Sequence, residues 1–113
     1  MRIIFLHRVW SVYGGGETVT ICLANEMVKR GIDVHVAYFK DSDKSKELPF
    51  IDTRIKAHRI DGVKFNEYSG DFFINKQDIK TASEGLLSLI KEYQIDIVHN
   101  QWWPVEFLQG IKD

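Results

Sequence analysis

Residues 2–30 read RIIFLHRVWSVYGGGETVTICLANEMVKR, and the order of residue types in this stretch decides the fold. Residues 3–6 are an unbroken apolar run, which is typical of a strand covered on both faces in a parallel sheet. A loop ends in three consecutive glycines, and a helical pattern begins after them: Gly14, Gly15, Gly16 and then Glu17. In an open α/β sheet the free N–H groups of such a helix N-terminus point into the crevice beyond the strand, where phosphates bind.

Composition and charge describe a soluble globular domain. The chain has 113 residues, of which 44% are hydrophobic and 27% charged, and this excludes a disordered or fibrous protein. Its 15 Lys and Arg nearly balance its 16 Asp and Glu, so nucleic acid is not expected as a partner. The single cysteine, Cys22, excludes an internal disulfide, and the first apolar run is too short for a signal peptide. We expect a cytoplasmic protein, with peripheral membrane contact left open.

The rest of the chain continues the alternation of strands and helices. The first helix is expected to pack on the sheet through one apolar stripe: Val19, Leu23, Ala24, Met27 and Val28. Gly31 ends this helix, because glycine readily takes the left-handed conformation of a C-cap. The later patterns predict strands at 32–39, 51–60 and 95–100, and helices at 78–93 and 105–111. The charges of strand 51–60 suit an edge of the sheet.

The chain is therefore expected to be an α/β protein with a Rossmann-like, mostly parallel sheet flanked by helices. The usual order of such a sheet, 3-2-1-4, places the first and fourth strands side by side. The glycine turn then faces the end of the fourth strand, which carries His99, Asn100 and Gln101. Doubly wound folds bind their ligands at this switch point, so the chemistry is expected there.

Large aromatic residues accompany both loops of the expected site. Trp10 follows the first strand, and Trp102 and Trp103 follow the fourth. An indole ring can stack on the apolar face of a sugar while its N–H donates a hydrogen bond, but such rings also serve as core residues. For the pair at 102 and 103 we expect one ring of each kind. His35 lies inside the second strand and is expected to be a packed structural residue.

A dinucleotide-binding enzyme is a weak interpretation of the glycine turn. Gly14 and Gly16 fit the first two glycines of GxGxxG, but Val19 occupies the position of the last one. An acidic residue for the ribose would be Asp41, which comes late after the second strand.

A different resemblance covers nearly the whole chain. The segments GGGE at 14–17, LA at 23–24, KRGIDVHV at 29–36 and IDIVHNQ at 95–101 occur in this order. Together they resemble the N-terminal domain of GT-B glycosyltransferases of group 1, family four, whose patterns run GGxE, LA, RGHEVxV and DIVHxH. Four loosely specific segments in the right order are more specific than any one of them.

The resemblance implies a protein of two Rossmann-like domains. Residues 1–113 would be the incomplete N-terminal, acceptor-side domain, and the C-terminal donor-binding domain would be absent. The implied reaction is the retaining transfer of a hexosyl unit from a nucleotide-sugar to a glycan or lipid-linked acceptor, without metal or cofactor. The fragment alone is expected to be inactive. A free-standing module that binds an anion or a glycan is the alternative from a non-enzyme class.

The resemblance also assigns roles to residues. Gly14, Gly15 and Gly16 would contact the donor diphosphate or sugar, where close backbone approach and N–H groups stabilise departing charge. Glu17 would orient a ligand, or its negative charge would simply interact favourably with the positive end of the helix dipole. His99 matches the first histidine of the family pattern, a catalytic candidate or an architectural residue. Gln101 matches the second, near the transferred sugar, and can hydrogen-bond but not accept a proton. Trp10, Trp102 and Trp103 complete the expected substrate-binding set.

Overall fold

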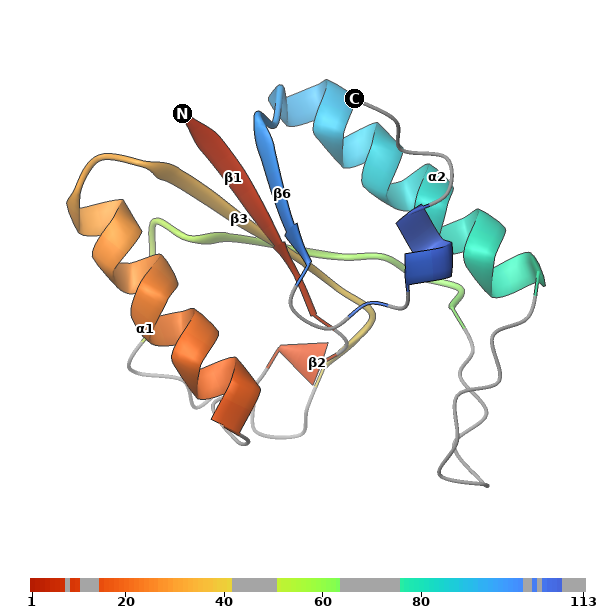
Figure 1. Ribbon diagram of the computed structural model, residues 1–113, viewed down its shortest axis with the longest axis horizontal. Helices are drawn as coiled ribbons and strands as arrows, with labels where there is room; N and C mark the ends of the chain where they lie inside the picture. Colours follow the sequence, from red (N-terminus) through yellow and green to blue (C-terminus); the bar gives the residue numbers. More distant parts are fainter. Residues whose placement is uncertain are drawn as a thin grey trace.

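A computed structural model describes residues 1–7, 9–10, 15–41, 51–63, 76–100, 103 and 105–108. Within these residues, four parallel strands form one sheet in the order β5-β3-β1-β6 (Figure 1). The strands are β1 (Arg2–Leu6), β3 (Asp33–Tyr38), β5 (Lys56–Arg59) and β6 (Ile97–Asn100). The expected fold class and the expected 3-2-1-4 order are both confirmed.

Two helices cover opposite faces of this sheet, as Figure 1 shows. They are α1 (Gly15–Lys29) and α2 (Lys76–Tyr93). Neither helix combines the length and the apolar character that crossing a membrane requires. The last expected helix is observed as a 3-10 turn, η2 (Val105–Leu108), and its remainder lies outside the described residues.

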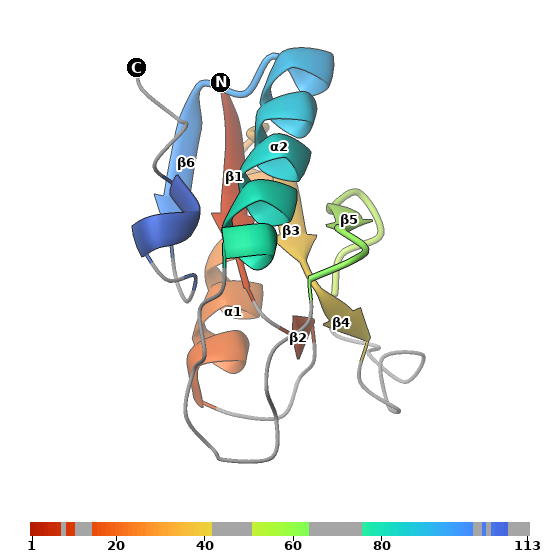
Figure 2. The same cartoon turned by 90° about the vertical axis from the view of Figure 1, so that its right-hand side faces the viewer.

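A short second sheet lies beyond the carboxyl-terminal ends of the strands of the main sheet. We call this end of the sheet the carboxyl edge. The strands β2 (Val9–Trp10) and β4 (Lys40–Asp41) pair in parallel, and Figure 2 shows them beyond the ends of β1 and β3. This pairing keeps the chain after β1 close to the chain after β3 at the edge where a doubly wound fold binds its ligand.

The core consists of two apolar layers, one on each face of β1. Ile3 and Phe5 pack beneath α1, and Ile4 and Leu6 pack toward α2. All four side chains are at most 5% exposed, as the unbroken apolar run predicts for a central parallel strand. Each contributes about 1.5–3 kcal/mol through burial, measured against an extended chain.

The buried face of α1 differs from the expected one. Val19 is 62% exposed and Leu23 is 42% exposed, whereas Ile21, Ala24 and Val28 are buried against the sheet. The helix carries two apolar stripes, and the one centred on Ala24 packs inward, since a methyl side chain lets the helix axis approach the strands closely. The expectation that Val19 and Leu23 pack on the sheet is therefore wrong.

The edge strand β5 confirms one expectation and corrects another. It lies at the end of the sheet order, as its charges suggest, and Ile55 and Ile60 beside it are buried. Ala57, expected to point inward, is exposed. Its register partner Val36 lies beneath α1, but the cover that α1 gives to β3 does not extend over the edge strand.

Two glycines fit requirements of the backbone and the packing. Gly31 has φ +84°, the left-handed conformation expected of a helix C-cap, and its N–H donates to the carbonyl of Val28 at 3.0 Å. Gly85 lies inside α2, where a Cβ atom would be 2.8 Å from Cγ2 of Ile60. The glycine therefore allows α2 to pack directly on the residue that follows β5.

Candidate functional site

The candidate site lies at the carboxyl edge of β1 and β6. These strands are parallel neighbours, and their last register pair is Leu6 with Asn100. The first turn of α1 lies at the same end of the molecule (Figure 1). The switch-point arrangement expected from the sequence is therefore present.

The start of α1 carries part of the expected substrate-binding turn. Gly15, Gly16 and Glu17 form the first turn of the helix, and Gly14 lies outside the described residues. The N–H groups of a first helical turn have no partner within the helix and carry partial positive charge. An anionic group at this edge would meet backbone donors that glycines leave accessible.

The other expected site residues fall on β2, on β6 and in the chain after β6. Trp10 is in β2, and His99 is an exposed residue of β6 whose ring centroid lies 5.2 Å from that of Phe5. Gln101 and Trp102 lie outside the described residues. Their roles stay predictions.

A buried histidine at this edge was not singled out from the sequence. His7, directly after β1, is 1% exposed, and its backbone N–H donates to the backbone carbonyl of Ala37 at 2.9 Å. Burial, together with the neighbouring His99, lowers the pKa of His7 from 6.5 to about 4. His7 is thus neutral at pH 7. Its place at the end of the apolar run was the signal available in the sequence.

Trp103 is a core residue of this edge. It is 4% exposed, and its indole N–H donates to the carbonyl of His7 at 2.8 Å. Its ring stacks on Phe39, with 4.5 Å between centroids, and meets Phe107 edge-on at 6.1 Å. Because both the ring and the N–H are used within the protein, Trp103 has little surface left for a sugar. The expected ligand-stacking role of Trp102 stays a prediction, because Trp102 lies outside the described residues.

Asn100 joins the end of β6 to Trp103. Its side-chain oxygen accepts from the Trp103 backbone N–H at 2.7 Å, and its side-chain nitrogen donates to the Trp103 carbonyl at 2.9 Å. One amide group therefore holds both polar backbone groups of Trp103.

Comparison with known sequences identifies the family. The sequence profile of Glycosyltransferase Family 4 matches residues 13–112. The chain belongs to this family. A search of curated proteins finds no match for this Glycosyltransferase Family 4 chain.

Two solved structures are similar in fold to this Family 4 chain. A glycosyltransferase from Rickettsia africae ESF-5 matches with a TM-score of 0.64 and 22% identity over 94% of the chain. MurG from Acinetobacter baumannii matches with a TM-score of 0.62 and 16% identity over 88% of it. The matched regions make up 24% and 27% of those proteins, so the chain spans about a quarter of their length.

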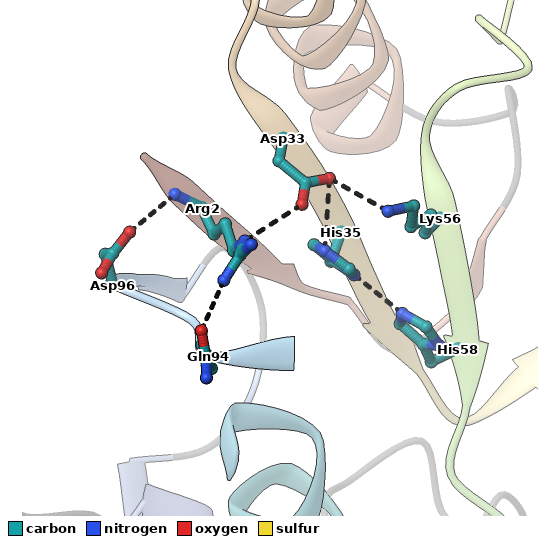
Figure 3. A network of polar contacts seen from close by, with 7 residues as sticks. All are labelled: Arg2, Asp33, His35, Lys56, His58, Gln94 and Asp96. Carbon is teal, nitrogen blue, oxygen red and sulfur yellow. Dashed lines mark hydrogen bonds and ion pairs between the residues drawn. The ribbon is translucent and has the colours of Figure 1, made fainter. Parts of the chain in front are cut away.

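The Family 4 chain has a second polar cluster at the amino edge of the sheet, away from the candidate site (Figure 3). Asp33 lies at the centre, 3.4 Å from Nε2 of His35, 3.4 Å from Nζ of Lys56 and 3.5 Å from Nε of Arg2. Nδ1 of His35 lies 2.9 Å from Nε2 of His58. His35 is fully buried, as the expectation of a structural histidine requires.

Burial and charge shift the acid–base properties of this cluster. Burial lowers the pKa of His35, although the carboxylate of Asp33 opposes the shift. Burial also lowers the pKa of His58, and His35 adds to the effect. Partial burial acts to raise the pKa of Asp33, but His35 and Lys56 hold it below its ordinary value. The cluster therefore pairs a carboxylate with histidines that favour their neutral forms.

Proposed function

We propose that this chain is the N-terminal, acceptor-side domain of a retaining glycosyltransferase. The enzyme would use a nucleotide-sugar, held mainly by a C-terminal domain, and transfer a hexosyl unit to a glycan or lipid-linked acceptor. The observation that carries the proposal is the family match over residues 13–112. We further propose a cytoplasmic enzyme with peripheral membrane contact where its acceptor is lipid-linked, and a reaction without a metal ion.

The geometry of the carboxyl edge supports this assignment. Departure of a nucleoside diphosphate creates negative charge, and preorganised N–H donors stabilise such charge more in the transition state than in the ground state. The first turn of α1, with Gly15 and Gly16, supplies such donors at the end of β1. In the proposed mechanism this turn contacts the diphosphate or the sugar across the cleft between the domains.

The end of β6 would supply the groups nearest the transferred sugar. Gln101 would hydrogen-bond a sugar hydroxyl or phosphate oxygen, and His99 would line the same edge. A glutamine cannot act as a general base at neutral pH, so proton transfer falls to the leaving phosphate, the acceptor or another residue. Trp102 would offer its ring to the acceptor sugar.

The test is a transfer assay on the full-length polypeptide that carries this domain. A panel of uridine, guanosine and adenosine diphosphate sugars is supplied with glycan and lipid-linked acceptors, and NMR of the product reads the anomeric configuration. Gln101→Ala should lower kcat by about 100-fold, comparable to the loss of one oriented donor. Gln77→Ala is the matched control, because Gln77 is an exposed residue of α2 that bonds only locally to Thr81 in the contacts described.

Each result of this assay decides part of the proposal. Transfer with the configuration retained supports it, and transfer with inversion contradicts the retaining mechanism. Absence of transfer from every donor contradicts the enzyme assignment. In that case binding of a diphosphate or an oligosaccharide by the 113-residue chain, measured by tryptophan fluorescence, would favour the binding module.

A further inference from the structure

A single side chain joins the end of β6 to Trp103, three positions further along the chain. Asn100 accepts a hydrogen bond from the backbone N–H of Trp103 and donates one to the carbonyl of the same residue, at 2.7 and 2.9 Å. Two bonds from one amide fix both the distance and the orientation of the peptide groups around Trp103. Only two residues, 101 and 102, lie between the two partners.

Trp103 is anchored in turn to the ends of two other strands. The indole N–H of Trp103 donates to the carbonyl of His7, which follows β1, in a buried bond of 2.8 Å. The ring stacks on Phe39, which follows β3. Trp103 thus connects the carboxyl ends of β1, β3 and β6, the three neighbouring strands at the switch point.

We propose that Asn100 and Trp103 are positioning residues, which together hold residues 101 and 102 at the reacting end of the sheet. This inference rests on the proposed function, in which Gln101 and Trp102 contact the sugars. Neither Asn100 nor Trp103 touches the substrates in this account. They act through the two residues between them.

Replacing Trp103 and replacing Asn100 should have different effects on stability. Trp103 is buried, and its replacement costs core packing as well as loop geometry. Asn100 is exposed, so its side chain adds little to the core, and its amide serves the local bonds to Trp103. Removing the Asn100 amide should therefore free the backbone of Trp103 from the end of β6 while the sheet and helices stay folded. This separation makes Asn100 the informative residue to change.

The experiment compares Asn100→Ala with Asn25→Ala in the full-length polypeptide. Asn25 is a matched control, because its side chain accepts a 2.9 Å hydrogen bond from the backbone N–H of Asp52, in the chain that leads into the amino end of β5. Asn100→Ala should lower kcat by about 10- to 100-fold, the usual effect of misplacing a reacting group. The KM for the nucleotide-sugar should change less than about threefold, since another domain would hold most of the donor.

Amide hydrogen exchange in the 113-residue chain provides a second measurement. Asn100→Ala should increase exchange at the amide of Trp103, which loses its acceptor, by about tenfold or more, with no increase at β1 and β3. Asn100→Asp keeps an acceptor for the Trp103 N–H but places an oxygen against the Trp103 carbonyl. The exchange of the Trp103 amide and the kcat of this variant should therefore lie between those of the unmodified protein and those of Asn100→Ala. Asn25→Ala should leave both kcat and the exchange of the Trp103 amide unchanged.

The outcomes separate this inference from the proposed function. An inactive unmodified protein contradicts the proposed function, and the positioning role with it. An active protein whose kcat is the same with Asn100→Ala contradicts only the positioning role. So does unchanged exchange at the Trp103 amide, or an equal loss of kcat in Asn25→Ala. A selective loss of kcat with faster local exchange supports it.

Discussion

The imidazole rings of His35 and His58 share a hydrogen bond, with Nδ1 of His35 2.9 Å from Nε2 of His58. One ring must donate and the other accept, so the bond exists when the pair is neutral or carries one additional proton. The ring of Tyr93 lies against both, at 4.9 and 4.7 Å between centroids. The pair therefore joins β3, the edge strand β5 and the end of α2, as part of the cluster in Figure 3.

Acid should weaken this junction. Both histidines have folded-state pKa values below 6.5, so at mildly acid pH the unfolded chain binds more protons than the folded one. Stability is then fully present above pH 6.5 and decreases as the pH falls below it. Asp33 and Glu92 moderate the effect, while Lys56 increases it. Urea denaturation should give a lower unfolding free energy at about pH 5 than at about pH 7.5.

A substitution at His58 tests whether the pH dependence of stability comes from the pair His35 and His58. His58→Phe keeps a ring beside Tyr93 but removes one titrating group, so the loss of stability on acidification should be smaller. At neutral pH the variant should be about 1–3 kcal/mol less stable, because Nδ1 of His35 loses its partner. A pH dependence in His58→Phe equal to that of the unmodified chain would contradict the assignment.

His7 should titrate separately, with a midpoint near pH 4. Burial, assisted by His99, lowers the pKa of His7 to about 4 in the folded chain. The corresponding stability is complete above pH 6.5 and is lost between pH 6.5 and about 4, by up to about 3 kcal/mol at 1.4 kcal/mol per pKa unit. NMR of the imidazole carbon and nitrogen shifts measures the midpoint. A folded-state midpoint near 6.5, the value expected in urea, would contradict the burial of this ring.

Trp103 should be one of the most sensitive positions in the chain. Trp103→Ala removes a ring that is 4% exposed and stacked on Phe39, and should cost about 3–5 kcal/mol of unfolding free energy. Trp103→Phe keeps an aromatic ring but leaves the buried carbonyl of His7 without the indole donor, at about 1–3 kcal/mol. Val19→Ala, at a residue 62% exposed, should change stability by less than about 0.5 kcal/mol. Denaturation followed by circular dichroism tests all three. A cost for Trp103→Ala as small as that of Val19→Ala would place the ring outside the core.

Gly85 should resist replacement by alanine, although alanine is the better helix former. Propensity favours alanine by about 1 kcal/mol, but its Cβ would lie 2.8 Å from Cγ2 of the buried Ile60, and such overpacking costs about 1–3 kcal/mol. We expect Gly85→Ala to lower the unfolding free energy overall. In an Ile60→Ala background the same change should be neutral or stabilising, because the obstructing atoms are gone. Equal effects in both backgrounds, measured as a double-mutant cycle, would show that the two residues do not meet.

Much of the fold could be read from local patterns. The apolar run at residues 3–6 indicated a strand buried on both faces, and Gly31 indicated the end of α1, because these features depend on neighbours within a few residues. The exact buried face of α1 could not be read in the same way. That helix carries two apolar stripes, and only the shape of the sheet beneath it selects Ile21, Ala24 and Val28.

The sequence by itself determined the order of the four strands of the main sheet and of the two helices, the parallel sheet and the family, since periodicity, turn residues and motif spacing are local properties of the chain. The short strands β2 and β4 lie in segments that the sequence pattern predicted as loops. Only the tertiary structure decided which side chains meet across it. Trp103 bonds to His7, 96 positions away, and His35 bonds to His58, 23 positions away. Such partners follow from strand register and from the packing of helices on the sheet, and no local pattern encodes them. The same physical reason explains why Trp103 proved to be a core residue and why Asn100 proved to be the residue that bonds both of its polar backbone groups.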